Sequence, residues 1–267
     1  MTIADYYKNY DEEGRLLSRY GMVEFITTME YIERYLKPGA RIIEIGAGTG
    51  RYSHALARNG FKVDAVELVE HNIEIFKRNT TPEENITITQ GNATNLSDFE
   101  SNSYDITLLL GPMYHLFNND EQIKALSEAV RVTKQDGIIF SAYCMADATI
   151  LTYGFKWKHL DEIMNDCGLD EEFANFKNPW GVFQLYRVDD IIKLHNQFDI
   201  ESLHLVGTDG YANHMREEVE NMDEHTFELY LKYHLATCEN TEMLGLSHHT
   251  LDIFRKKEFY DKKSTNN

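Results

Sequence analysis

Three glycines at alternating positions follow a short run of apolar residues in the first fifth of the chain. In RIIEIGAGTGRY, residues 41–52, Gly46, Gly48 and Gly50 come after a series of isoleucines, and an acid, Glu44, lies just before the first glycine. A strand that enters a glycine-rich loop brings backbone close to a ligand, and such loops commonly hold nucleotide-like molecules. The chemical question is therefore which nucleotide-like ligand this loop holds.

The spacing of the glycines argues against two common ligands. A phosphate-binding P-loop needs G-x-x-x-x-G-K-[ST], and no Lys-Ser or Lys-Thr pair follows this loop. The dinucleotide fingerprint G-x-G-x-x-G needs a third glycine at the position that the bulky Arg51 occupies. The arrangement here is G-x-G-x-G, which predicts a tight backbone turn beside the ligand without the pyrophosphate geometry.

A second acid lies at the distance expected for recognition of a ribose. Glu67 follows Gly46 by 67 − 46 = 21 residues, at the end of the alternating segment FKVDAVEL. An acid about 20 residues after the first glycine commonly accepts hydrogen bonds from ribose hydroxyls. This feature indicates a ribose, but it is shared by several classes of nucleotide-binding protein.

Patterns typical of strands and helices alternate from residue 41 to residue 144, which predicts an α/β fold with a doubly wound, mostly parallel sheet. A helix with one apolar face precedes them and ends at Pro38-Gly39. Within the alternation, Asn119 with Gln122 predicts the capped start of a helix, and Asp136-Gly137 predicts a turn into the next strand. The segments with strand patterns, seven in all, are 41–45, 61–68, 85–90, 104–110, 138–143, 199–207 and 249–257.

No Pro/Gly/Ser-rich linker interrupts the chain, so we expect residues 1–267 to form a single domain. Its parts are an N-terminal helical cap at 1–36, a cofactor-binding core at 37–144, a helical insertion at 146–186, and closing helices and strands at 187–257. The insertion is rich in aromatic residues, which could line an acceptor pocket or simply pack a lid. Residues 215–236 read as one long helix.

The sequence resembles the class I S-adenosylmethionine-dependent methyltransferases, which have a Rossmann-like fold. IIEIGAGTG is similar to their first motif, AVEL to the next, and YDITLLLGPMYHL to the motif at the end of the fourth strand. The resemblance is good over about 36–144 and looser through LHLVG and LDIFRK, which suit the family's closing antiparallel hairpin. It implies a methyltransferase with S-adenosyl-L-methionine as its cofactor.

Carried onto this sequence, the resemblance implies roles for individual residues. Glu67 would accept hydrogen bonds from both ribose hydroxyls, Glu44 would position the methionine amino group, and Leu68 would pack on adenine. Where the family often has an acid this chain has Asn92, so the adenine contact would run through the Asn92 amide or the backbone of Ala93. The residues implied to wrap or approach the methionine end and the ribose are Gly46, Ala47, Gly48, Gly50 and Gly111.

The acceptor side is less defined by the sequence. GPMYHLF, residues 111–117, lacks the Asn/Asp-Pro-Pro-aromatic sequence of DNA amino-methyltransferases. His115 is a candidate general base, because an ordinary imidazole titrates near neutrality, and a loop-anchoring histidine is the alternative. Tyr114 either contacts the ligand or only packs against neighbouring residues.

Two further groups of residues have weaker signals. The segment YYKNYDEEGR resembles segments that fold over the cofactor, so Tyr6, Tyr7 or Tyr10 would cover it and Arg15 would pair with its carboxylate; a plain surface helix is the alternative. The pair His248-His249 has neither acidic partners nor metal-ligand spacing, so we expect no metal.

The composition restricts the class of partner. A formal net charge of −18, from 44 acids and 26 bases, argues against a nucleic-acid-binding face. Three separated cysteines, no signal peptide and no long apolar run predict a cytoplasmic protein without a membrane segment. We therefore expect methyl transfer to a small molecule; transfer to tRNA, rRNA or protein, and a catalytically silent cofactor-binding module, are the alternatives. The pattern does not indicate an oligomeric state.

Overall fold

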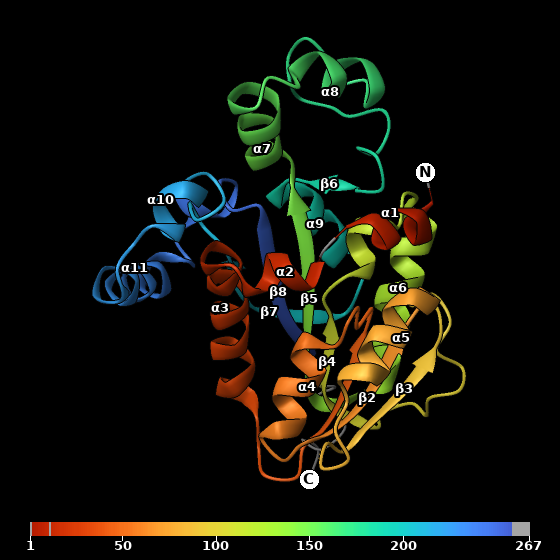
Figure 1. The fold of residues 1–267 in the computed structure, drawn as a ribbon. Helices are drawn as coiled ribbons and strands as arrows, with labels where there is room; N and C mark the ends of the chain where they lie inside the picture. Colours follow the sequence, from red (N-terminus) through yellow and green to blue (C-terminus); the bar gives the residue numbers. More distant parts are fainter. Residues whose placement is uncertain (1, 11, 258–267) are drawn as a thin grey trace, which may run out of the picture.

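The structure is a computed structural model that describes residues 2–10 and 12–257, and its centre is one mixed β-sheet (Figure 1). Seven strands run in the order β3-β2-β1-β4-β5-β8-β7, and a short eighth strand, β6, pairs with β5 off this path. The strands are β1 (Arg41–Ile45), β2 (Lys62–Glu67), β3 (Ile86–Gln90), β4 (Tyr104–Leu109), β5 (Thr133–Met145), β6 (Leu185–Tyr186), β7 (Ile200–Gly207) and β8 (His249–Lys256).

The directions of the strands confirm the predicted fold class. Strands β1 to β5 are parallel, whereas β8 runs antiparallel to both β5 and β7 and closes the sheet as a hairpin. The two-residue strand β6, parallel to β5, is an addition that the sequence pattern does not predict. The strand order reverses between β1 and β4, which is the switch point where sheets of this kind bind ligands.

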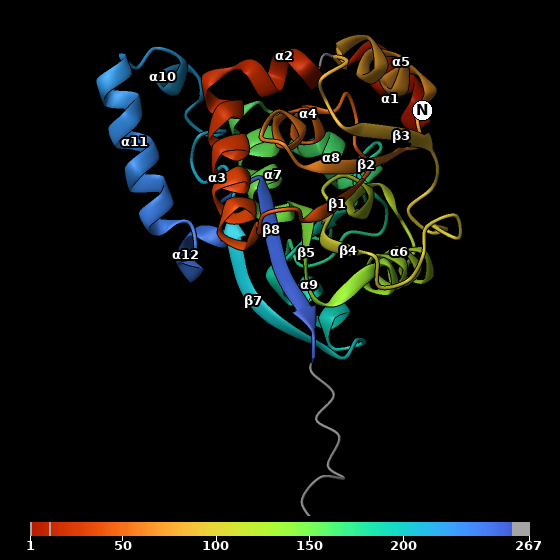
Figure 2. The ribbon, with the colours of Figure 1, turned by 90° about the horizontal axis from the view of Figure 1, so that it is seen from below.

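Helices cover both faces of the sheet (Figure 2). Ile32 of α3 and Leu56 of α4 pack in one core cluster, and Leu126 of α6 and Leu194 of α9 pack in another on the opposite face. Strand β1 supplies both clusters, because Ile42 points to the first and Ile43 and Ile45 to the second, all fully buried. The helices of the first half are α1 (Ile3–Asn9), α2 (Glu12–Leu17), α3 (Arg19–Tyr35), α4 (Arg51–Arg58), α5 (Glu70–Asn79) and α6 (Asn119–Val132).

The remaining helices lie after β5. They are α7 (Ala146–Thr149), the π-helix η2 (Ile150–Lys156), α8 (Leu160–Asp166), α9 (Val188–His195), α10 (Arg216–Glu220), α11 (Glu224–Thr237) and α12 (Thr241–Leu244). Helices α7 and α8 with η2 rise from the end of β5 above the carboxyl edge of the sheet, at the top of Figure 1. The insertion at 146–186 is thus helical in its first half, and irregular from residue 167 to strand β6.

Three predictions of local structure are corrected. The cap of α6 is Asn118 rather than Asn119, because its side-chain oxygen accepts a hydrogen bond from the Glu121 N–H at 2.9 Å. The Asp136-Gly137 pair is not a turn into a new strand but lies within β5, where the pairing with β4 shifts from Tyr104–Thr133 to Ile106–Ile138. A Cβ at Gly137 would lie 2.9 Å from the Tyr104 carbonyl oxygen, so close approach of the backbone at this irregularity explains the glycine.

The long helix predicted at 215–236 is also wrong, since it is two helices. Helix α10 ends at Glu220, and α11 starts after Asp223, whose carboxylate accepts a hydrogen bond from the Thr226 N–H at 2.8 Å. A capping aspartate inside an otherwise helical pattern is the signal for this break. Over residues 2–10 and 12–257, none of the helices has the length and apolar character needed to cross a membrane.

Candidate active site

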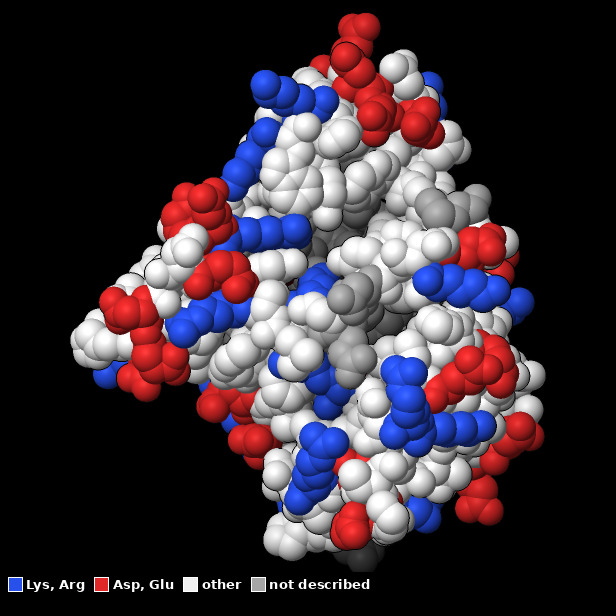
Figure 3. All heavy atoms as spheres, viewed as in Figure 1, with Lys and Arg blue, Asp and Glu red and all other residues white. Residues whose placement is uncertain are grey.

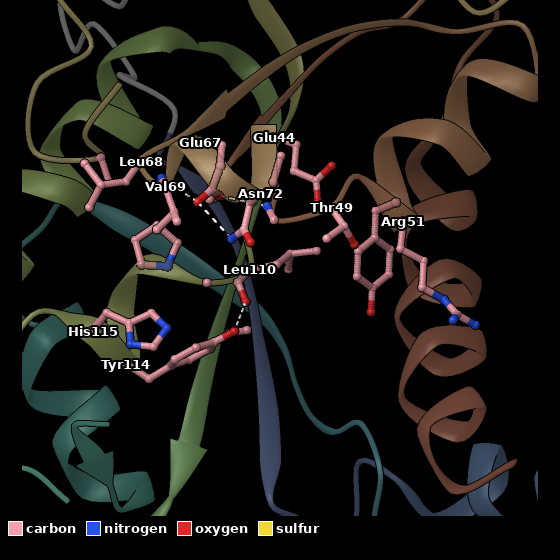
Figure 4. Close-up of a pocket in the computed structure, with 18 of the residues that line it drawn as sticks. Glu44, Thr49, Arg51, Glu67, Leu68, Val69, Asn72, Leu110, Tyr114 and His115 are labelled. Atoms are coloured by element: carbon pink, nitrogen blue, oxygen red, sulfur yellow. Dashed lines mark hydrogen bonds between the residues drawn. The ribbon is translucent and has the colours of Figure 1, made fainter. Parts of the chain in front are cut away.

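A cavity opens at the carboxyl ends of β1, β2 and β4, where the strand order reverses (Figure 4). It holds about 1250 Å³ of space, including its open mouth. Of the residues predicted to bind the cofactor, all but Tyr6, Tyr10 and Gly50 lie around it. Those present are Tyr7, Arg15, Glu44, Gly46, Ala47, Gly48, Glu67, Leu68, Asn92, Ala93 and Gly111. Chain segments that are distant in sequence thus converge on one cavity.

The glycine loop needs its glycines for two reasons. Gly46 and Gly50 have φ angles of 76° and 95°, a left-handed conformation that side chains rarely adopt. A Cβ at Gly46 would lie 2.5 Å from the Pro112 ring, and one at Gly50 would lie 2.5 Å from the Phe76 ring. Gly50 therefore does not line the cavity but allows α4 to start against α5.

Glu67 organises the floor of the cavity. Its two carboxylate oxygens accept hydrogen bonds from the backbone N–H groups of Gly48, at 2.8 Å, and Val69, at 2.9 Å. The amide of Asn72 on α5 donates a third bond at 3.2 Å, a contact that the sequence pattern did not indicate. Burial raises the pKa of Glu67, and these donors oppose that shift. The carboxylate both faces the cavity and holds the glycine loop.

Glu44 is a second buried acid beside the loop. It is 2% exposed and accepts a hydrogen bond from the Ser53 hydroxyl of α4. Burial raises its pKa to about 8, and the nearby Glu67 adds to the shift. A cationic group placed beside Glu44 would favour the charged carboxylate, so this position suits an ammonium.

The far end of the cavity has apolar and amide groups. Leu68 has 48% of its surface exposed, which leaves an apolar side chain open to a ligand at the cavity edge. The Asn92 side-chain oxygen accepts hydrogen bonds from the backbone N–H and hydroxyl of Thr94, both at 3.0 Å, which fixes the loop that carries Ala93. This end offers a platform and polar edges for a planar base.

His115 has partners on both ring nitrogens. Its Nδ1 lies 2.8 Å from the Val182 carbonyl oxygen and so must donate; its Nε2 lies 2.8 Å from the Tyr7 hydroxyl, which donates to it. Burial lowers the pKa of His115, so the ring is neutral. Tyr114 donates its hydroxyl to the Leu110 carbonyl at 2.8 Å and lines the cavity. The backbone anchor considered for His115 is thus present, together with an unpredicted pairing to Tyr7.

The N-terminal tyrosines divide between two cavities. Tyr7 lines both cavities, whereas Tyr6 and Tyr10 line only the second one, so of the three tyrosines predicted to cover the cofactor the structure places only Tyr7 at the first cavity. Tyr6 and Tyr10 are four residues apart and stack on each other on one side of α1, whereas Tyr7 points in another direction. Arg15 lines both cavities and forms an ion pair with Glu24 at 2.7 Å.

The second cavity adjoins the first beneath α7 and η2 and holds about 680 Å³, including open space. Four residues line both cavities: Tyr7, Arg15, Tyr114 and His249. Five of the eleven other described residues that line it are Tyr, Trp or Phe, including Tyr153, Trp180 and Phe183 from the insertion. Tyr6 of α1 packs edge-on against Phe183, with ring centroids 5.3 Å apart, which joins the N-terminal cap to the insertion.

The expectation that His249 has no acidic partner is wrong. The structure places Nδ1 of His249 2.8 Å from Asp209 and 3.4 Å from Glu24. These acids raise the pKa of His249 well above its usual value, despite its burial, so the ring is a cation. Asp209 also accepts bonds from the Ser247 hydroxyl and from the N–H groups of residues 248 and 249. The three groups could hold a metal ion by proximity alone, but the protonated ring and the occupied carboxylate fit an ion-pair network.

Several wall residues had no signal in the sequence. Thr28, Tyr52, Thr208 and Leu251 reach the first cavity from α3, α4 and the C-terminal hairpin. Each is part of an ordinary amphipathic pattern, so only the folded chain distinguishes it from a core residue.

The first cavity therefore fits a nucleoside joined to an amino acid. We propose that Glu67 would bind the ribose, Leu68 and the 92–93 loop the base, and Glu44 an ammonium. The close approach of Gly46 and Gly111 leaves room for the linking chain, because a Cβ at Gly111 would lie 3.2 Å from the Gly46 carbonyl oxygen. The fold and site define a protein that binds S-adenosylmethionine at a doubly wound sheet.

Comparisons with known proteins agree with this geometry. Residues 43–141 match the model of a family described as a methyltransferase domain. A glycine/sarcosine N-methyltransferase of Aphanothece halophytica is 26% identical over 66% of this chain and 69% of its own. A demethylmenaquinone methyltransferase of Clavibacter sepedonicus is 35% identical over 38% of this chain and 40% of its own length.

Solved structures show the same fold. A methyltransferase of Thermotoga maritima, described as a possible histamine N-methyltransferase, is 17% identical, covers 94% of this chain and 98% of its own, and has a TM-score of 0.56. The family match over residues 43–141 and these relatives support an S-adenosylmethionine-dependent methyltransferase of class I that uses S-adenosyl-L-methionine as its cofactor.

Proposed function

We propose that this methyltransferase transfers the methyl group of S-adenosylmethionine to a small molecule held in the second cavity. One observation carries the proposal: the second cavity adjoins the cofactor cavity and shares Tyr7, Tyr114, Arg15 and His249 with it. A molecule in the second cavity would thus lie beside the methionine end of the cofactor. Alignment of two bound molecules and exclusion of water are the main catalytic devices of such a transfer.

The enclosure of the second cavity favours a small acceptor over a macromolecule. Helix α1 covers it from one side and the insertion at 146–186, which we propose is an acceptor lid, covers it from the other. The names of the two curated relatives describe small acceptors, glycine or sarcosine and demethylmenaquinone, which also supports this class. The net charge of −18 further disfavours nucleic acid.

When bound, the cofactor supplies a methyl group already activated on a sulfonium, so the protein's task is to place the acceptor and to accept any proton it loses. Tyr7 and His115 form the pair that can do this. The Tyr7 hydroxyl lies at the boundary of the two cavities and donates to Nε2 of His115, whose other nitrogen is held by Val182. Tyr7 would take a proton as it passes its own to the neutral ring of His115.

We also infer that the reaction takes place in the cytoplasm. All three cysteines, Cys144, Cys167 and Cys238, are buried free thiols, which fits a reducing compartment.

The test is a methyl-donor turnover assay on the full chain with a library of metabolites, read out by the mass of the product. We expect one or a few small molecules to gain the mass of a methyl group, with S-adenosylhomocysteine formed in equal amount. Methylation of RNA or protein, with no methylated metabolite, would contradict the small-molecule proposal. Full cofactor binding with no methylated product of any kind would indicate a silent module.

A further inference from the structure

We infer that the acceptor is an aromatic or similarly apolar acid, and that Arg216 binds its carboxylate. This inference rests on the proposed function of the second cavity and names the class of molecule that the cavity takes. It depends on the charge of the residues that surround the second cavity and on the hydrogen bonds that Arg216 makes.

The second cavity carries positive charge and aromatic rings. Of the described residues that line it, none is an aspartate or a glutamate, although the whole chain has 44 acids against 26 bases. Figure 3 shows the hollow below the insertion bordered by uncharged and basic side chains, while the acidic side chains in view lie farther out. The described wall of the second cavity is therefore basic and uncharged, in contrast to the acidic chain as a whole.

Arg216, at the start of α10, is held rigidly at this wall. Its Nε and Nη2 both donate to the side-chain oxygen of Asn213, at 2.9 and 2.6 Å. Asn213 is itself 3% exposed and donates its amide to the buried carboxylate of Asp209. The rings of Tyr20 and Trp157 lie on the guanidinium, with centroids 4.7 and 4.8 Å away. The side chain is thus oriented before any acceptor arrives.

Arg216 differs from the other cations of the cavity. Arg15 is paired with Glu24, and the protonated His249 is paired with Asp209 and Glu24. His248 adds no charge, because burial lowers its pKa to about 3. Across the described part of the chain, Arg216 forms no ion pair with a carboxylate, and its only hydrogen bonds go to the neutral amide of Asn213.

The free edge of Arg216 matches a carboxylate. A guanidinium has five N–H donors, and those on Nη1 have no hydrogen-bond acceptor among the residues that the structure describes. These nitrogens are not buried, so they are open to a ligand in the cavity that Arg216 lines. One N–H of Nη1 and the second N–H of Nη2 point to the same edge of the guanidinium, and two such parallel bonds hold a carboxylate more strongly than a neutral amide. The rings of Tyr153, Trp180 and Phe183 accept the apolar body.

The test compares carboxylates with matched neutral amides on the intact protein saturated with S-adenosylhomocysteine. The probes are benzoate, phenylacetate and 3-phenylpropionate, each paired with its primary amide, and calorimetry measures both affinities. We expect at least one acid to bind about tenfold or more tightly than its amide, the effect of a charged hydrogen bond. Equal affinities for acid and amide in all pairs, or no binding of any acid, would overturn the inference.

Variants assign the preference to Arg216. Arg216→Gln should bring the acid-to-amide ratio to within about twofold of one, and Arg216→Lys, which keeps the charge without the fork, should give an intermediate ratio. The control is Arg34→Gln, which removes an arginine that also lies over a ring, Tyr31, but outside the cavity. It should keep the wild-type ratio. An unchanged ratio in folded Arg216→Gln would overturn the assignment, and the wild-type comparison stands if that variant does not fold.

The outcome separates this inference from the proposed function. An acid preference that depends on Arg216, without methylation of any metabolite, would keep the anion site and contradict the proposed function. Methyl transfer only to neutral or cationic small molecules would keep the proposed function and contradict the anion site.

Discussion

The cofactor cavity adjoins the second cavity, which we propose is the acceptor cavity, but the chain builds the two in opposite ways. The cofactor cavity takes its key groups from the ends of three neighbouring parallel strands, within residues 44–111. The second cavity combines α1, the insertion, the start of α10 and residues 248–249, and its most distant members, Tyr6 and His249, lie 249 − 6 = 243 residues apart in the sequence. A site at strand ends is constrained by backbone geometry, whereas a site between added segments can change its chemistry by replacing side chains.

The largest effect should come from Glu67, at the centre of the cofactor cavity. Two charged hydrogen bonds to ribose hydroxyls, at about 1.5 kcal/mol each or more, predict that Glu67→Ala lowers cofactor affinity about a hundredfold. Calorimetry with S-adenosylhomocysteine measures this, and Glu70→Ala, an exposed acid three residues on, is the control.

Glu67→Ala should also lower the stability of the folded protein. It removes the acceptor of the Gly48 and Val69 N–H groups, and unsatisfied buried donors cost about 1–3 kcal/mol each. An unchanged affinity in the folded variant would show that the carboxylate only supports the loop.

A smaller effect is expected where the two cavities meet. His115→Gln should lower turnover at least about tenfold, because general-base assistance is worth about 10²–10⁴, while cofactor affinity stays within about twofold. Tyr7→Phe removes the hydroxyl that bonds Nε2 and should lower turnover to a similar extent.

The pH profile distinguishes a base from a packing residue. Since burial lowers the pKa of His115 below 6.5, wild-type activity should rise with pH through a limb below that value, and His115→Gln should lack the limb. Normal turnover in both variants across neutral pH would leave His115 as an anchor of the 112–115 turn.

The contribution of Glu44 to stability should change with pH. Its pKa is about 8 in the folded chain and 4.5 as a free group, so the folded state keeps a proton that the unfolded state loses. The stabilisation is complete below pH 4.5 and is lost as pH rises towards 8, at up to about 1.4 kcal/mol per pH unit. Denaturant unfolding between pH 5 and 8 should show this slope relative to Glu44→Gln, and parallel curves for the two proteins would show that Glu44 is charged when buried.

The smallest expected effect is an absence of nucleic-acid binding. The excess of 44 acids over 26 bases should repel phosphates, so filter binding should find no salt-sensitive affinity for RNA. Tight binding of RNA that declines steeply with salt would contradict the small-molecule proposal and favour a macromolecular acceptor.

The contrast between the two cavities also explains how much of each could be predicted from the sequence. The order of strands and helices up to β5, the glycine loop and Glu67 follow from periodicity and spacing, because each depends on residues close in the chain. Two of the wrong predictions concern the ends of helices. The cap of α6 is Asn118, one residue from the predicted position, and the predicted long helix is interrupted for a few residues up to Asp223. The Tyr7–His115 pair, the Arg15–Glu24–His249–Asp209 network and Arg216 depend on long-range packing, which leaves no periodic signal.

The most direct measurement is calorimetric titration of the intact protein with S-adenosylhomocysteine and, separately, with a nicotinamide dinucleotide. The cavity geometry predicts binding of the first at one site per chain and no useful binding of the second, because Arg51 stands where a dinucleotide site needs a glycine. Binding of the dinucleotide with none of the methyl-donor product would contradict the account of both cavities.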